Sequence, residues 1–192
     1  MNKTADTKYS IHPLLAERWS PRSFDAQREI SEQDIYGILE SAAWAPSSMN
    51  EQPWRYYYAH RADEDSFKAL WECLTEGNQV WAKDVSILMA VSMKKYFQRN
   101  GKVNRTAQHD VGLANAQLVL EALHRGIHAH MMGGFHDDKA RSLLNLPEEE
   151  EVVCFIALGY KADPANLADE KLQKREMAER SRLSIDSIAT RL

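Results

Sequence analysis

The sequence predicts one α+β domain, residues 1–192, in which helices flank a central sheet. Two continuous apolar runs of strand length, Val85–Val91 and Val152–Leu158, indicate buried strands. The segment His109–Arg125 is apolar almost all round, which is typical of a helix buried in a core or between subunits. A chain of 192 residues is long enough to bury a sizeable core, so no second domain is needed.

The first half of the chain supplies four further elements. Pro13 suits the first position of a short helix. Ser31 is a good N-cap, and apolar residues then recur at helical spacing as far as Ala42. Trp54–Ala59 is an aromatic strand whose three tyrosines indicate burial on both faces or at an interface. Ser66–Leu74 is an amphipathic helix, which Gly77-Asn78-Gln79 is expected to break.

The second half continues with the strand Ile127–Met132. Asp137–Leu146 is predicted to be a short helix, capped by Asp137 or Asp138 and stopped by Pro147. Glu148–Glu151 is expected to form a solvated acidic turn. Lys161–Met177 is polar and partly helical. The tail Glu179–Leu192 carries spaced apolar residues and would be disordered unless it docks onto something.

The segment 93–106 is strongly basic, and two interpretations stay open. Its cations have no acid between them: Lys94, Lys95, Arg99, Lys102 and Arg105. A solvated, mobile excursion is slightly favoured. The alternative is a lid that attracts an anionic substrate or a dinucleotide.

Composition and motif content exclude several classes. A net charge of -4 argues against a general nucleic-acid binder, and no stretch approaches the length of a membrane span. Met1–Ser10 lacks the apolar core of a signal peptide. Cys73 and Cys154 are expected to be free thiols in a reducing cytoplasm. His128 and His130 alternate onto one strand face, but without cysteines or carboxylates at ligand spacing no metal site is predicted. Walker, Gly-x-Gly-x-x-Gly and Gly-x-Ser-x-Gly motifs are absent.

Four motifs carry most of the functional information. Ala45–Trp54 reads Ala-Pro-Ser-Ser-Met-Asn-Glu-Gln-Pro-Trp, a stiff loop rich in hydroxyl and amide groups. Upstream lies the basic turn Arg18–Phe24. His130–Phe135 contains a Gly-Gly loop, and Arg180–Leu183 contains two arginines one residue apart. In this order and spacing the motifs resemble those of the FMN-dependent nitroreductase family over almost the whole chain.

The resemblance implies an α+β fold with a central mixed sheet, and a homodimer whose buried core helix lies at the subunit interface. It also implies two FMN sites at that interface. Arg18, Ser20, Arg180 and Arg182 match the residues that clamp the phosphate, and Arg22 matches a cation at the pyrimidine edge of the ring. The remaining candidates for the same subunit are Trp19, Asn78, Met131, Met132, Gly133 and Gly134. Residues matching those that reach the flavin from the other subunit are Pro46, Ser47, Ser48 and Asn50.

By the same resemblance, the protein is expected to be an NAD(P)H oxidoreductase acting on nitroaromatics, quinones or similar acceptors. Hydride passes from NADH or NADPH to FMN N5 and on to the acceptor by a ping-pong mechanism, without a catalytic side chain. A specialised enal or enoate reductase, a dehalogenase, or a flavin-binding dimer with little turnover are the alternatives. Many family members place a lysine near flavin N1 where this chain has Trp81, and Lys83 is the nearby candidate to replace it.

Overall fold

The computed structural model describes residues 3–192, so Met1 and Asn2 of the N-terminal segment Met1–Ser10 lie outside it. The first half contains α1 (Pro13–Glu17), α2 (Glu32–Ala43), η1 (Ser48–Asn50), β1 (Trp54–His60), α3 (Glu64–Glu72), α4 (Glu76–Ala82) and β2 (Ile87–Lys94). The second half contains α5 (Ala107–His124), β3 (His128–Met132), α6 (Asp137–Leu143), β4 (Glu150–Gly159), η2 (Pro164–Asn166), α7 (Glu170–Met177) and α8 (Ile185–Ile188).

The four strands form one sheet in the order β1-β2-β4-β3. The predicted α+β class is confirmed, but the expected mixed pairing is wrong for the described strands, because all three pairings are antiparallel. The reason lies in the connection through α5. It carries the chain from β2 to the parallel strand β3, and β4 then inserts between the two. Each neighbouring pair therefore runs in opposite directions.

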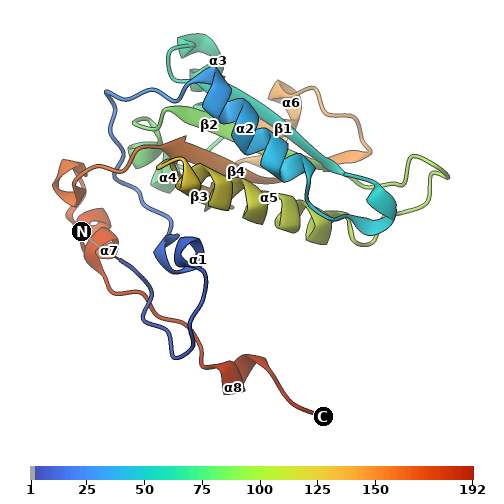
Figure 1. Cartoon of the computed structure of the whole chain (residues 1–192). Helices are drawn as coiled ribbons and strands as arrows, with labels where there is room; N and C mark the ends of the chain where they lie inside the picture. Colours follow the sequence, from blue (N-terminus) through green and yellow to red (C-terminus); the bar gives the residue numbers. More distant parts are fainter. Residues whose placement is uncertain (1–2) are drawn as a thin grey trace.

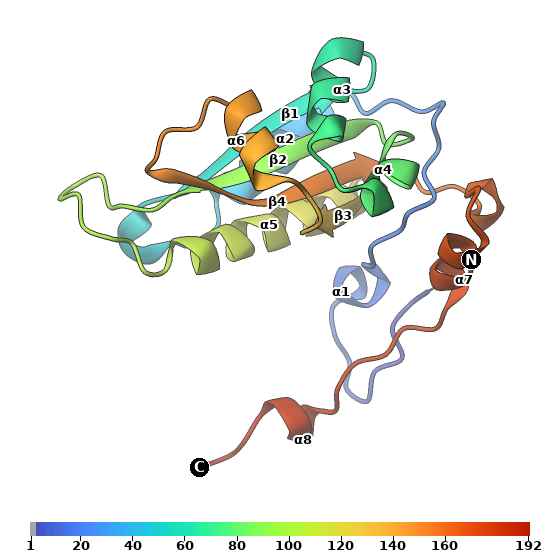
Figure 2. The same cartoon turned by 180° about the vertical axis from the view of Figure 1, so that it is seen from behind.

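Helices cover both faces of the sheet, and each face has its own apolar core (Figures 1 and 2). One core joins α3, α4 and α6 to the sheet around Leu74, Trp81 and Phe155. The other joins α2 and α5 around Ile38, Leu118 and Ile156. The three tyrosines of β1 divide between the two faces, as predicted from their run in the sequence.

Local signals set several helix boundaries. The Ser31 side chain accepts a hydrogen bond from the Asp34 backbone N–H, which satisfies one of the free donors at the start of α2. Helix α5 ends at His124 with Arg125 as its C-cap, and Gly126 follows with φ 74°, a left-handed conformation that glycine adopts without strain. Both boundaries agree with the sequence prediction. Among residues 3–192, no helix has the length and apolarity needed to cross a bilayer.

Three local expectations are wrong. Gly77-Asn78-Gln79 were expected to end the helix that precedes them, but they lie inside α4. A new helix begins after its N-cap Thr75, and Gly77 falls in the first turn of that helix. Asp137 and Asp138 lie in the first turn of α6 rather than at its cap, which is His136. Glu150 is not part of a solvated turn: it is buried in β4, where its carboxylate accepts hydrogen bonds from Ser92 Oγ and Tyr57 OH.

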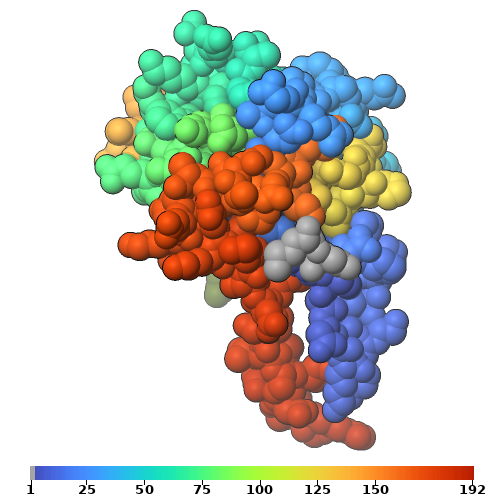
Figure 3. Space-filling model, turned by 90° about the vertical axis from the view of Figure 1, so that its left-hand side faces the viewer, coloured from blue at the N-terminus to red at the C-terminus, as the bar shows by residue number. Residues whose placement is uncertain are grey.

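Two extended arms leave the body of the molecule side by side (Figure 3). One is the N-terminal segment leading into α1, and the other is the C-terminal segment beyond α7. Arg180 ties them together, since its Nη1 donates to the carbonyl oxygens of Lys3 and Ala16. The C-terminal arm carries exposed apolar side chains, including Leu183 (74% exposed) and Ile188 (69% exposed). Such side chains are unfavourable in water and indicate a surface that another molecule covers.

Candidate functional site

The basic turn and the C-terminal basic pair converge although they are about 160 residues apart in the chain. Burial lowers the pKa of Arg18, and the nearby positive charges of Arg180 and Arg182 lower it further. The pKa of Arg180 is lowered by burial and by Arg182. None of the ion pairs between described residues includes any of these three arginines. Three guanidinium groups without a carboxylate counterion form a site suited to an anion such as phosphate.

The middle of the basic turn is held from two sides. The carbonyl of Pro21 contacts His130 Nδ1 at 2.8 Å, and the backbone N–H of Arg22 donates to the Glu176 carboxylate at 2.9 Å. Trp19 lies at the edge of the turn, where the Lys3 ammonium stacks over its ring at 4.4 Å. Ser20 precedes Pro21 and is half-buried. The predicted turn residues therefore share one ordered structure with β3 and α7.

The Gly-Gly loop after β3 meets the start of α4. The carbonyl of Gly134 accepts hydrogen bonds from Asn78 Nδ2 (3.0 Å), Thr75 N (3.0 Å) and Thr75 Oγ1 (3.2 Å). A Cβ at Gly134 would lie 2.7 Å from Asn78 Nδ2, so a side chain there would displace this contact. A Cβ at Gly133 would meet nothing within 4 Å, so its backbone borders open space. Asn78 and the loop are thus brought together, with Met131 exposed and Met132 buried beneath.

Trp81 and Lys83 differ sharply in environment. Trp81 is fully buried, with its ring 4.6 Å from that of His130 and 6.0 Å from that of Phe24. Lys83 is exposed at the end of α4. Trp81 therefore supports the turn and β3 from the core side, and it supplies no cation in place of the family lysine.

The loop before β1 holds an unusual backbone conformation. Met49, Asn50 and Gln52 have φ values of 57°, 56° and 51°, which side chains other than glycine seldom adopt. Two contacts maintain it: Asp110 Oδ2 accepts from the Ser48 backbone N–H at 3.0 Å, and Ser47 Oγ accepts from Gln52 N at 3.0 Å. Strain of this kind persists only where the surroundings enforce it, and it is common at ligand-binding loops.

This loop does not meet the basic turn within one chain. Phe24 bridges to Lys161 just beyond one end of β4, whereas β1 begins opposite Met93, which pairs with Glu151 at the other end. Ten strand residues correspond to roughly 30 Å, which is longer than one FMN can span. Pro46, Ser47, Ser48 and Asn50 therefore lie at one end of the sheet, and the three clustered arginines lie near the other.

The basic segment is an ordered hairpin beside that loop. Tyr96 bridges to Val103, and Gly101 occupies the turn with φ 65°. The backbone N–H of Gln98 donates to Glu51 Oε1 at 2.7 Å, which ties the hairpin to the loop. Arg99, Lys102 and Arg105 are exposed, as the favoured interpretation of a solvated segment expects, and the mobility of the segment stays a prediction.

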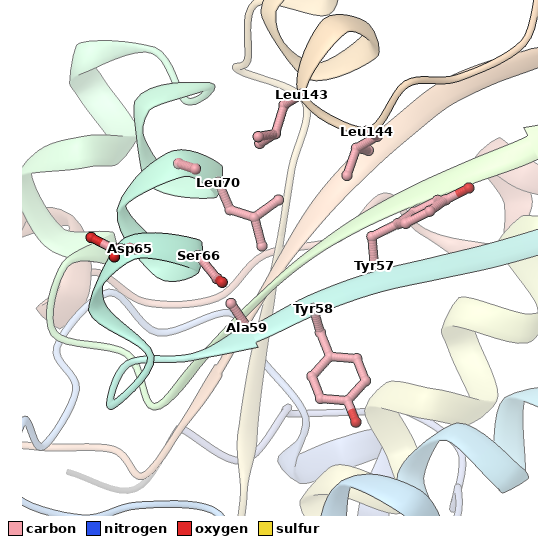
Figure 4. A pocket seen from close by; sticks show the side chains of 9 residues that line it. Tyr57, Tyr58, Ala59, Asp65, Ser66, Leu70, Leu143 and Leu144 are labelled. Carbon is pink, nitrogen blue, oxygen red and sulfur yellow. The ribbon is translucent and has the colours of Figure 1, made fainter.

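Two of the hollows on the described surface are relevant to the candidate site. A shallow one of about 400 Å³ is bounded by β1, α3 and α6, where Tyr57, Leu70 and Leu144 face one another (Figure 4). It contains none of the predicted site residues. A second, of about 430 Å³, lies between the two arms, and Arg180 and Arg182 are among its lining residues.

The residues around the turn fit a flavin mononucleotide. The arginine cluster supplies uncompensated positive charge for the phosphate. The open backbone at Gly133 and the amide of Asn78 supply polar groups for a ring edge. Within the described residues there is no cluster of three potential metal ligands, and His128 and His130 instead have pKa values lowered to about 4, chiefly by burial.

Four residues that hold the turn, the Gly-Gly loop or the loop before β1 were not among the predicted site residues: Thr75, Asp110, His130 and Glu176. All four act on backbone groups that are distant in the sequence, so no spacing rule reveals these contacts. Thr75 alone gave a usable signal, since threonine is a common N-cap residue and it lies just before Asn78.

A family model, a relative and solved structures all indicate the same protein family. A family model described as the nitroreductase family matches residues 15–83 and 74–160. An NADH dehydrogenase/NAD(P)H nitroreductase of Archaeoglobus fulgidus is 30% identical over 144 residues, covering 72% of this chain and 78% of the relative. The crystal structure of an oxidoreductase containing FMN superposes with a TM-score of 0.91 at 34% identity, covering 99% of this chain and 95% of the other. An Exiguobacterium sibiricum nitroreductase in complex with FMN superposes with a TM-score of 0.77 over 98% of this chain and 100% of the other; its 23% identity supports the fold alone.

Proposed function

Because the chain belongs to the nitroreductase family of FMN-dependent oxidoreductases, we propose that it carries electrons from NAD(P)H to nitroaromatic, quinone or related acceptors by a ping-pong mechanism. The observation that carries this proposal is the cluster formed by Arg18, Arg180 and Arg182, which have no carboxylate partner among the described residues. Bound FMN supplies the hydride chemistry through N5, so the protein has to bind, orient and shield it.

This proposal gives each of the surrounding side chains a role. Arg18, Arg180 and Arg182 hold the phosphate, supported by Ser20. Arg22 would supply a cation at the ring edge where negative charge develops on reduction, and a cation there would favour the reduced form. Asn78 and the backbone of Gly133 and Gly134 bind polar atoms of the ring, with Trp19, Met131 and Met132 around them. No side chain is needed as nucleophile or general base.

The same proposal includes a homodimer with FMN at the interface. Pro46, Ser47, Ser48 and Asn50 lie too far from the basic turn of their own chain, so they serve the flavin of the partner. Trp44, 81% exposed just before this loop, supports an intersubunit surface there. Gly112 and Ala116 are exposed on the outer side of α5, where small side chains allow another chain to approach. The apolar C-terminal arm docks on the partner. With its free cysteines, the protein is proposed to work in the cytoplasm.

An anaerobic titration tests the proposal. Protein loaded with FMN is mixed with NADH or NADPH and the flavin absorbance is followed, after which the reductant is removed and an acceptor is added. We expect bleaching by the nicotinamide, and recovery of colour with nitroaromatics or quinones. Protein that binds FMN but is not bleached would be a flavin-binding dimer with little turnover. A panel that includes enals, enoates and halogenated aromatics separates the specialised enzymes of the family from a broad reductase.

A further inference from the structure

The peptide group between Pro21 and Arg22 is clamped at both ends by buried side chains. Its carbonyl oxygen contacts Nδ1 of His130 at 2.8 Å. Its N–H donates to both carboxylate oxygens of Glu176, at 2.9 and 3.0 Å. His130 is 8% exposed and Glu176 is 1% exposed, so water competes weakly for either contact. One peptide plane is thereby fixed by residues 109 and 154 positions away in the chain.

The His130 contact has a defined direction. A carbonyl oxygen only accepts hydrogen bonds, so Nδ1 carries the proton and donates it. Burial lowers the pKa of His130 to about 4, which leaves the ring neutral at pH 7, with its one N–H on Nδ1. The ring cannot turn freely, because Trp81 packs against it at 4.6 Å and Trp81 is itself fully buried.

The Glu176 contact is equally specific. One carboxylate oxygen also accepts from the backbone N–H of Ser23 at 3.1 Å, so Glu176 binds two successive N–H groups of the turn. Burial lowers the pKa of Arg22, and the Glu176 charge opposes that effect. A donor at the carbonyl and an anion at the N–H polarise the peptide in the same sense, so the two contacts reinforce each other.

We propose that His130 and Glu176 are positioning residues, which fix the Pro21–Arg22 peptide and thereby aim the Arg22 guanidinium at the pyrimidine edge of the flavin. This inference rests on the proposed function. Arg22 stabilises the negative charge at the ring edge, which is larger in reduced FMN than in oxidised FMN. Loosening the clamp therefore costs more affinity for the reduced form, and the midpoint potential of the bound flavin falls. Replacing a residue that only supports the fold would lower the affinities for oxidised and reduced FMN equally and leave the midpoint potential unchanged.

The experiment measures the FMN dissociation constant and the flavin midpoint potential of the full-length protein. His130→Leu removes the donor without changing the charge at pH 7. We expect affinity for reduced FMN to fall about tenfold more than affinity for oxidised FMN, which lowers the two-electron potential by about 30 mV. His130→Asn keeps a short amide donor and is expected to restore most of that shift. Glu176→Asp keeps the charge but withdraws the carboxylate, so its potential should fall in the same direction.

Glu179→Asp is the matched control, since Glu179 is an exposed glutamate just beyond the end of α7. It should leave both quantities unchanged. The conservative variants His130→Asn and Glu176→Asp keep the test valid if His130→Leu does not fold. If His130→Leu and Glu176→Asp both keep the midpoint potential of the parent protein, even with weaker FMN binding, the proposed positioning role of His130 and Glu176 is wrong. A parent protein that does not bind FMN would overturn the proposed function instead, so the two failures are distinguishable.

Discussion

Removing the C-terminal arginines should separate phosphate binding from arm anchoring. Arg182 Nη1 donates only to the neighbouring Ser181 carbonyl among the described contacts, so Arg182→Ala deletes charge with little structural change. Arg180 also holds the carbonyls of Lys3 and Ala16, so Arg180→Ala loosens both arms as well. The double variant is expected to remain folded but largely free of flavin.

The size of the effect follows from the contacts that are lost. A hydrogen bond to a charged group contributes roughly 1.5–3 kcal/mol. At about 1.4 kcal/mol per decade, Arg182→Ala should weaken FMN binding by about one to two decades, and the double variant by about two to four. The melting temperature should fall only in the presence of FMN for Arg182→Ala, because that loss comes from ligand stabilisation. For Arg180→Ala it should also fall without FMN.

Quenching of flavin fluorescence on adding apo-protein gives the dissociation constants. Arg191→Ala is the matched control, because it removes the same charge from an exposed position on the same arm. Its affinity should equal that of the parent. If the double variant also binds FMN as tightly as the parent, the arginine cluster does not hold the phosphate and the reasoning fails.

Three further predictions concern the rest of the molecule. Replacing the exposed hairpin cations Arg99, Lys102 and Arg105 by glutamine should raise KM for NADPH more than for NADH, because NADPH carries an extra phosphate, and the difference should shrink in high salt. The control Lys171→Gln should leave the kinetics unchanged. Unchanged kinetics in the hairpin variant as well would mean that the hairpin is a solvated element without a role in cofactor binding. Sedimentation should give twice the chain mass of 22.0 kDa, and deleting residues 183–192 should weaken both the dimer and flavin retention, whereas a monomer that keeps tight FMN would refute the shared site. The free energy of unfolding should fall as pH drops from about 6.5 toward 4, because His128 and His130 take up protons in the unfolded chain before the folded one; the loss is at most roughly 3 kcal/mol for each histidine, from a shift between 6.5 and about 4. Denaturant titrations at several pH values measure it. His130→Asn should reduce the pH dependence, and the exposed control His124→Gln should not.

Local patterns predicted the elements well because the deciding interactions are close in sequence. The Ser31 cap bonds three residues along, and Gly126 ends a helix through its own backbone conformation. The direction of strand pairing was not predictable in this way. It depends on β4 inserting between β2 and β3, a long-range choice that leaves no periodic trace in any one strand.

In the candidate site too, contacts between residues distant in the sequence could not be predicted from local patterns. No local rule links Arg18 to Arg180, and only the resemblance to a family predicted that they meet. Glu150 lies in an acidic run that predicted a solvated turn, yet Ser92 and Tyr57 satisfy its carboxylate inside the sheet. Glu176 similarly lies in a polar stretch, and its importance comes from two backbone N–H groups on another element.

The most direct test of the central claim is the flavin content of the purified protein. The protein is isolated, denatured and centrifuged, and the released chromophore is identified and counted against the number of chains. FMN in equal number to chains, recovered after reconstitution if it is lost in purification, is the result expected from the arginine cluster and the Gly-Gly loop. A colourless protein that cannot be reconstituted with FMN would contradict the account.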